Sequence, residues 1–130
     1  MLMSRLGVAA VLVVLCAGCA TGQRETDSRA AATGFLTAMT DGDTGAACGL
    51  LAPKTRQGLE YQNRQPCPTS LGTVEITGGE VGKVEVWGDR AQAQASTGTL
   101  FLVELDSGWR VSAAGCTRAA DGTYDCLLAA

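Results

Sequence analysis

The hydrophobic pattern of this 130-residue chain changes its period near Leu71, and that change limits the folds available to it. Before Leu71, apolar residues recur every three or four positions, as they do along one face of an α-helix. After Leu71, apolar and polar residues alternate, as they do in strands with one buried face. Helices followed by a run of hairpin-connected strands predict an α+β domain, in which the helices pack on one face of a curved antiparallel sheet.

The helical part is predicted to contain two or three short helices with recognisable ends. An apolar stripe from Ala31 to Met39 marks the first, and Asp27 or Ser28 can cap its start. Gly42 can take the left-handed conformation that ends this helix. Asp43 can then cap a second helix over residues 44–51, and a third over residues 53–61 begins at a proline, which suits a first helical turn.

The second part of the chain predicts four or five antiparallel strands. Gly88-Asp89 and Asp106-Ser107-Gly108 are typical turn sequences between them. The fourth apolar run, LFLVEL, is nearly continuous, which is expected of a strand covered on both faces. The predicted strands cover residues 73–77, 83–87, 91–95, 100–105 and 109–113.

The N-terminus has the layout of a bacterial export signal. A short start with one positive charge precedes the apolar run Leu6–Leu15, and the small residue Gly18 directly precedes Cys19. This arrangement resembles a lipobox, which implies cleavage between Gly18 and Cys19 and a diacylglyceryl group on the sulfur of Cys19. The alternatives are a plain signal peptide, or a redox or metal-binding C-x-x-C formed by Cys16 and Cys19.

If residues up to Cys19 form a lipobox, the chain is divided into three parts. Residues 1–18 are the leader, residues 19–29 are a lipidated polar tether, and residues 30–130 are one domain. The tether has no apolar period, so we expect it to be flexible and to reach about 35 Å when extended. The predicted location is the outer face of the cytoplasmic membrane, with the lipid as the membrane contact.

Four cysteines remain after the predicted cleavage, and an oxidising compartment favours disulfides between them. Of the three pairings, we favour Cys48–Cys67 and Cys116–Cys126, since each closes a short loop without crossing the other. A four-cysteine zinc site is the rival interpretation, but no close pair remains to give zinc-ligand spacing. Free or mixed thiols are the third alternative.

Composition argues against several functions. The net charge of −3 provides no basic surface for nucleic acid. The chain has no histidine, so it lacks the commonest general base and metal ligand. We find no catalytic constellation, no metal-ligand spacing and no cofactor-binding motif, and so predict no catalytic residues, metal or cofactor.

Three segments resemble small actinobacterial lipoproteins with an NTF2-like, or cystatin-like cone, domain. They are FLTAMTDGDTGAACGLLAP at Phe35–Pro53, VEVWGDRAQAQ at Val84–Gln94 and GWRVSAAGCTRAADGTYDC at Gly108–Cys126. The resemblance implies a cone-shaped fold and a place in the cell envelope, and it supplies no active-site residues. NTF2-like folds often dimerise through the open sheet face, but no residue here decides the oligomeric state.

The leading functional hypothesis is a non-catalytic module that binds a partner protein or a small apolar ligand. It predicts an apolar cavity or patch lined by residues such as Phe35, Leu36, Trp87, Phe101 and Trp109. An isomerase- or dehydratase-type enzyme is the first alternative, and it requires a buried carboxylate beside a tyrosine. A purely structural envelope protein with a filled core is the second.

Overall fold

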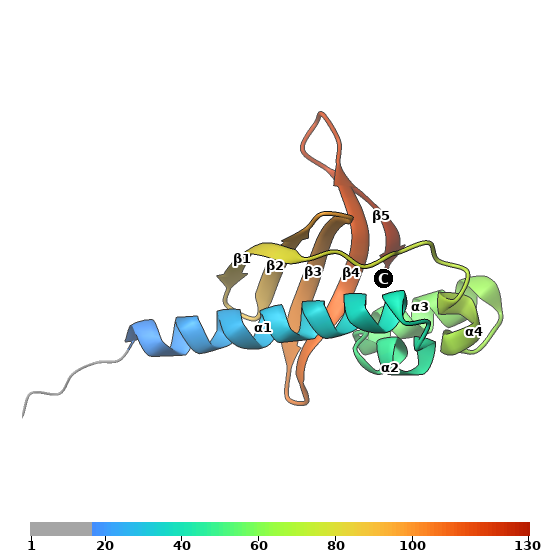
Figure 1. The fold of residues 1–130 in the computed structure, drawn as a ribbon, viewed down its shortest axis with the longest axis horizontal. Helices are drawn as coiled ribbons and strands as arrows, with labels where there is room; N and C mark the ends of the chain where they lie inside the picture. The colour runs from blue at the N-terminus through green and yellow to red at the C-terminus, as the bar shows by residue number, and fades with distance from the viewer. Residues whose placement is uncertain (1–16) are drawn as a thin grey trace, which may run out of the picture.

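The protein has an α+β fold in which short helices precede an open antiparallel sheet (Figure 1). The computed structural model describes residues 17–130. The helices are α1 Ala17–Thr40, α2 Thr44–Gly49, α3 Pro53–Asn63 and α4 Cys67–Leu71, and the strands are β1 Val81–Trp87, β2 Arg90–Ala95, β3 Gly98–Leu105, β4 Gly108–Arg118 and β5 Tyr124–Ala129. Residues 1–16 of the predicted leader lie outside the described residues.

The sheet is a meander in which each strand pairs with the next, in the order β1-β2-β3-β4-β5. The four strands predicted between residues 83 and 113 lie within β1 to β4, so these predictions are confirmed. Glycine is needed at two of the turns, because Gly88 and Gly108 have φ angles of 55° and 110°.

The strand predicted over residues 73–77 is wrong. This segment continues the turn that follows α4, with the Val74 amide donating to the Leu71 carbonyl at 3.0 Å. Ile76 is buried in the core, so the alternation reflects burial of every second side chain without a neighbouring strand. The fifth strand is instead β5, which pairs with β4 and was not among the strands predicted from the sequence.

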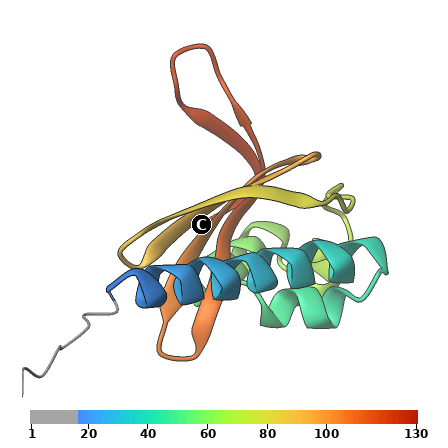
Figure 2. The ribbon, with the colours of Figure 1, turned by 60° about the vertical axis from the view of Figure 1, so that its left-hand side comes forward.

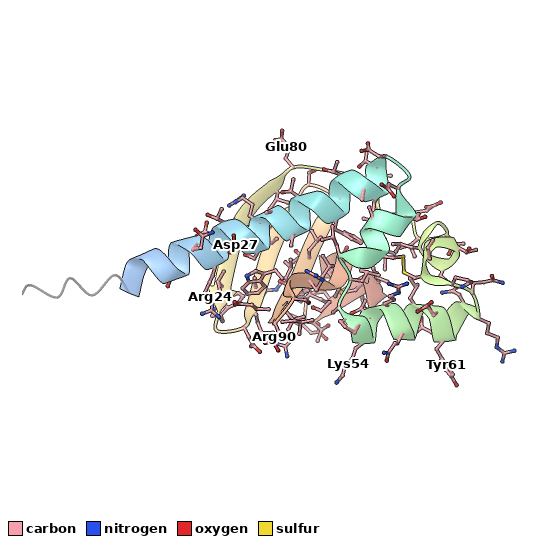
Figure 3. The ribbon with its side chains drawn as sticks, turned by 90° about the horizontal axis from the view of Figure 1, so that it is seen from below. Arg24, Asp27, Lys54, Tyr61, Glu80 and Arg90 are labelled. Atoms are coloured by element: carbon pink, nitrogen blue, oxygen red, sulfur yellow. A yellow bond between two sulfur atoms is a disulfide. The ribbon has the colours of Figure 1, made fainter. Side chains whose placement is uncertain are left out.

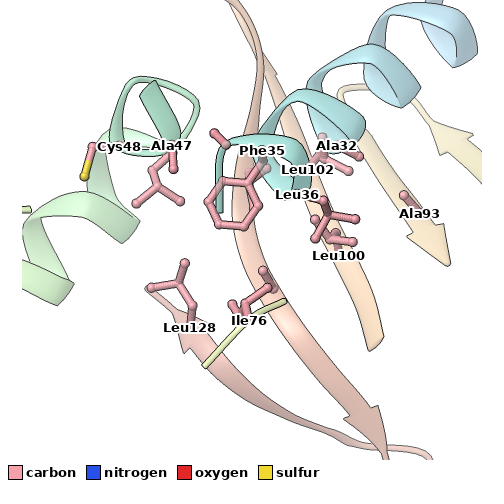
Figure 4. Packing of buried hydrophobic residues seen from close by; sticks show 14 of the residues in the cluster. Ala32, Phe35, Leu36, Ala47, Cys48, Ile76, Ala93, Leu100, Leu102 and Leu128 are labelled. Atoms are coloured by element: carbon pink, nitrogen blue, oxygen red, sulfur yellow. The ribbon is translucent and has the colours of Figure 1, made fainter. Parts of the chain in front are cut away.

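The core lies between α1 and one face of the sheet (Figure 4). Phe35 and Leu36 of α1 are almost completely buried. Ala91 and Ala93 of β2 belong to the same buried cluster, and their small side chains leave room for a close helix. The cluster also contains leucines from the neighbouring β3 and from β5, namely Leu100, Leu102 and Leu128.

A short backbone bridge covers the part of β4 that β5 leaves unpaired. β5 pairs only with Ala113–Arg118. On the same edge, the Ala52 amide donates to the Val111 carbonyl, and the Val111 amide donates to the Leu50 carbonyl, each at 2.8 Å. This bridge fixes the start of α3 beside the sheet.

The flexible tether predicted for residues 19–29 is wrong in its secondary structure, because these residues belong to α1. This part of the helix lacks the apolar stripe that marks the rest, and it is held against the sheet by polar contacts. The Arg24 side chain donates to Glu104 of β3 at 3.0 Å, and Arg29 donates to the Gly82 carbonyl of β1 at 2.7 Å. Within the helix, the Ser28 hydroxyl donates to the Glu25 carbonyl.

The structure contains the two disulfides that the sequence favoured, Cys48–Cys67 and Cys116–Cys126. The first links the two short helices α2 and α4, and both of its cysteines are buried. The second links paired residues on the neighbouring strands β4 and β5. The first disulfide is therefore the covalent link within the helical half, whereas the second reinforces an existing strand pair.

Removing the Cys48–Cys67 disulfide by the double change Cys48→Ala, Cys67→Ala should lower the free energy of unfolding by about 3 kcal/mol. The cause is the added chain entropy of the unfolded state, since the disulfide spans 19 positions. The matched control is Cys116→Ala, Cys126→Ala, which opens a loop of 10 positions and should cost about 0.6 kcal/mol less. Urea denaturation measures both, and a larger loss in the control would contradict the chain-entropy explanation.

Candidate functional site

The structure does not bring the five predicted pocket residues together. Phe35, Leu36 and Trp109 are packed in the core, where they are at most 5% exposed. Trp87 is 54% exposed at the end of β1. Phe101 lies on the sheet face opposite the helices, because it pairs with Gln92, which alternates with the buried alanines of β2. These five residues therefore do not form the common cavity or patch expected from the sequence.

Phe101 is instead half-buried in a small cluster on the outer side of the sheet. The Tyr124 ring meets the Phe101 ring edge-on, with 5.0 Å between ring centroids. The Gln92 amide donates to the Tyr124 hydroxyl at 3.2 Å. This aromatic pair closes over its own part of the sheet, and so it does not form a ligand cavity.

A groove with a mostly apolar lining lies farther along the same face, where the start of α3 meets the sheet. Its volume is about 350 Å³. Val103 is only 8% exposed and forms part of the groove wall with Leu105. The full lining is Ala52, Pro53, Lys54, Thr55, Arg90, Val103, Leu105, Ser112 and Ala130.

Two cationic side chains border this α3–β3 groove. Lys54 comes from the first turn of α3 and Arg90 from the start of β2, and both are exposed (Figure 3). Arg90 is 3.7 Å from the Asp89 carboxylate, but an exposed pair of this kind contributes little and leaves guanidinium donors available. The groove therefore combines an apolar interior with positive charge at its border.

The wall of the groove opposite β3 is held in place by buried hydrogen bonds. Thr55 is completely buried, and its hydroxyl donates to the Ser112 carbonyl of β4 at 2.8 Å. Together with the Leu50–Ala52 bridge, this bond fixes the first turn of α3 against β4. The α3–β3 groove is thus formed by rigid elements, which lowers the cost of ordering it on binding.

Sequence reasoning missed the groove but contained one of its signals. The LFLVEL run indicated a strand covered on both faces, and Val103 and Leu105 are the outward-facing members that the groove uses. The covering element could not be identified, because α3 is brought to this face by long-range contacts such as the bridge between Leu51 and Val111. That contact joins segments half a chain apart.

A second hollow, of about 460 Å³, lies where α1 ends and the segment before β1 begins. Met39, Leu71 and Ile76 contribute apolar atoms to it, and Glu75 contributes a carboxylate. It lacks the pair of cations that borders the α3–β3 groove. We therefore regard the α3–β3 groove as the stronger candidate site.

The structure does not contain the arrangement that the enzyme alternative requires among residues 21–130. No Asp or Glu in this part of the chain is buried. The buried polar side chains are Ser28, Thr55 and Ser70, and each donates to a backbone carbonyl. The same part of the chain has no cluster of His, Cys, Asp or Glu suited to a metal ion.

Over residues 17–130, no helix combines the length and apolar character needed to cross a bilayer.

Comparison with protein-family models, with curated proteins and with solved structures finds no match to this chain.

In the described part of the chain, two exposed side chains have pKa values that are shifted by a neighbouring residue. In the β4–β5 turn, the Thr123 hydroxyl donates to the Asp121 carboxylate at 2.6 Å and the Thr123 amide at 3.0 Å. These hydrogen bonds lower the pKa of Asp121. On β1, the hydrogen bond and charge of Glu85 raise the pKa of Lys83. Both groups lie away from the groove lining.

The Asp121 carboxyl should titrate below the range of an ordinary aspartate, and Thr123→Val should raise its pKa by removing the hydroxyl donor. Because the folded-state pKa is the lower one, this group stabilises the fold above its unfolded pKa. That contribution is lost as the pH falls through the folded pKa. Carboxyl chemical shifts measured by NMR against pH test this. The control Thr97→Val should leave the titration midpoint of Asp121 unchanged. An equal shift in both variants would contradict the Thr123 hydrogen bond as the cause.

Proposed function

We propose that this protein is a lipoprotein whose domain acts as a non-catalytic binding module at the outer face of the cytoplasmic membrane. In this proposal residues 1–18 direct export, and Cys19 carries the lipid. The apolar leader that ends at Gly18-Cys19 supports export and lipidation. Two disulfides support an oxidising compartment. The order of helices before a meander is compatible with an NTF2-like cone, which we retain as part of the proposal.

The ligand we propose is a small amphipathic anion, with an apolar chain and one acidic head group. The observation that carries this choice is the α3–β3 groove, whose interior is apolar and whose border carries Lys54 and Arg90. Its volume of about 350 Å³ lies within the usual range of small-molecule sites. Burial of the chain against Val103 and Leu105 would supply most of the affinity, and the two cations would orient the head group.

Native mass spectrometry of the full chain purified from its own membrane tests the ligand class directly. A retained acidic amphiphile of low mass would support the proposal. A stoichiometric protein in place of a small molecule would redirect it to the partner-binding hypothesis, since a partner could cover the same face.

Lipidation at Cys19 predicts that Cys19→Ala releases the protein from the membrane fraction. A thiol at this position is required for the diacylglyceryl thioether, and stable attachment needs the acyl chains. Intact-mass analysis of the wild-type protein should show a cleaved leader and added acyl mass. Cys16→Ala is the matched control, since this residue leaves with the leader and its replacement should not release the protein. An uncleaved wild-type chain would contradict the assignment.

Binding of a fluorescent long-chain fatty acid should weaken at least about tenfold in Leu105→Glu, because the new carboxylate places unpaired charge in the apolar wall. Lys54→Ala and Arg90→Ala should each weaken it by up to about fivefold, the size expected of an exposed ion pair. Lys83→Ala is the control of equal charge change, on β1 and outside the groove. Fluorescence titration measures the Kd, and an equal loss in Lys83→Ala would mean that net charge alone governs binding.

A further inference from the structure

Helix α1 is fixed to the sheet from Arg24 onward, close to its N-terminal end. The Arg24 guanidinium forms an ion pair with Glu104 of β3 at 2.9 Å and also donates to the Gly88 carbonyl in the β1–β2 turn. About one and a half helical turns later, Arg29 donates to the carbonyls of Val81 and Gly82. The Arg24 contacts hold the start of α1 against the end of the sheet where β1 turns into β2 (Figure 2), and the Arg29 contacts hold the helix to the first residues of β1.

The position of Arg24 limits how far the domain can stand from a lipid on Cys19. Only four residues separate the two positions. As helix, which is their conformation in the structure, the step from Cys19 to Arg24 is about 7.5 Å along the axis. Even a fully extended chain would reach only about 18 Å. The long flexible spacer expected from the sequence is therefore absent between these two residues.

The surface next to this attachment point contains an exposed tryptophan. Trp87 directly precedes Gly88, the turn residue that Arg24 contacts, and it is 54% exposed. The membrane–water interface is the environment that a tryptophan prefers, because the ring is apolar and the indole N–H is polar. The exposed aromatic Tyr61 lies toward the opposite end of the domain, away from the start of α1 (Figure 3).

The cationic and anionic side chains at this end of the domain nearly balance, so they do not select an anionic surface. Arg24 is paired with Glu104, and Arg90 lies 3.7 Å from Asp89. Contact with a bilayer would then depend on Trp87 and on the short chain length to the lipid, with little dependence on salt.

We infer that the β1–β2 turn is a membrane-contacting surface, with Trp87 in the headgroup region of the bilayer that holds the acyl chains of Cys19. The inference rests on the proposed lipidation. It also gives the α3–β3 groove a position, because Arg90 belongs to both the turn and the groove border. The groove then opens beside the lipid surface, where amphipathic molecules are concentrated.

The test uses the full lipidated protein in phosphatidylcholine vesicles whose acyl chains are brominated close to the headgroup. Bromine quenches tryptophan only at contact, and Trp109 is buried in the core, so the change reports on Trp87. The emission attributable to Trp87 is the difference between the wild-type protein and Trp87→Phe. We expect it to be about twofold lower in these vesicles than in the same vesicles without bromine. Tyr61→Ala is the matched control and should leave this quenching unchanged, as should raised salt.

A second variant separates orientation from attachment. Inserting about ten Gly/Ser residues after Thr21 lengthens the link without altering the domain contacts from Arg24 onward, and it should abolish most of the quenching. Full quenching in this variant, or no quenching in the wild-type protein bound to vesicles, would overturn the inference and leave the lipid attachment intact. Absence of acyl mass on Cys19 would overturn the inference together with the proposed function.

Discussion

The packing of α1 on the inner face of the sheet is the contact on which the rest of the structure depends. The sheet is open, and its inner face would expose a continuous apolar surface without a covering helix. Phe35 and Leu36 fill that face, and the alanines of β2 are small enough to let the helix lie across the strands. The same helix also carries the arginines that clamp its N-terminal part to β1 and β3. The core contacts and the arginine contacts are therefore made by one continuous helix.

Local sequence signals predicted much of this fold, because they act over a few residues. The alternation in β1, β2 and β4 follows directly from one buried sheet face, and the nearly continuous apolar run of β3 follows from cover on both faces. The cap at the start of α2 is likewise local: the Asp43 carboxylate accepts from the Ala46 amide at 3.1 Å. The two favoured disulfides follow from short loops, which need no knowledge of distant contacts.

The features that were missed depend on contacts between distant segments. The first turns of α1 have no apolar stripe, and they stay helical beside partners such as Glu104, eighty residues away. The α3–β3 groove exists because α3 is held against β4, which neither segment encodes alone. The five predicted pocket residues do not meet for a related reason. The hydrophobic period of a strand predicts that a side chain is buried, but not on which face of the sheet it lies.

The backbone bridge between Leu50–Ala52 and Val111 has a consequence for the order in which the chain can fold. The four described helices are synthesised before any strand, yet the start of α3 lacks its hydrogen bonds to the sheet until β4 is available to form them. Closing a loop of this size costs entropy that only the completed contact repays. The helical half should therefore remain loosely ordered on its own, and it should become fixed in one cooperative step once nearly all of the domain is present.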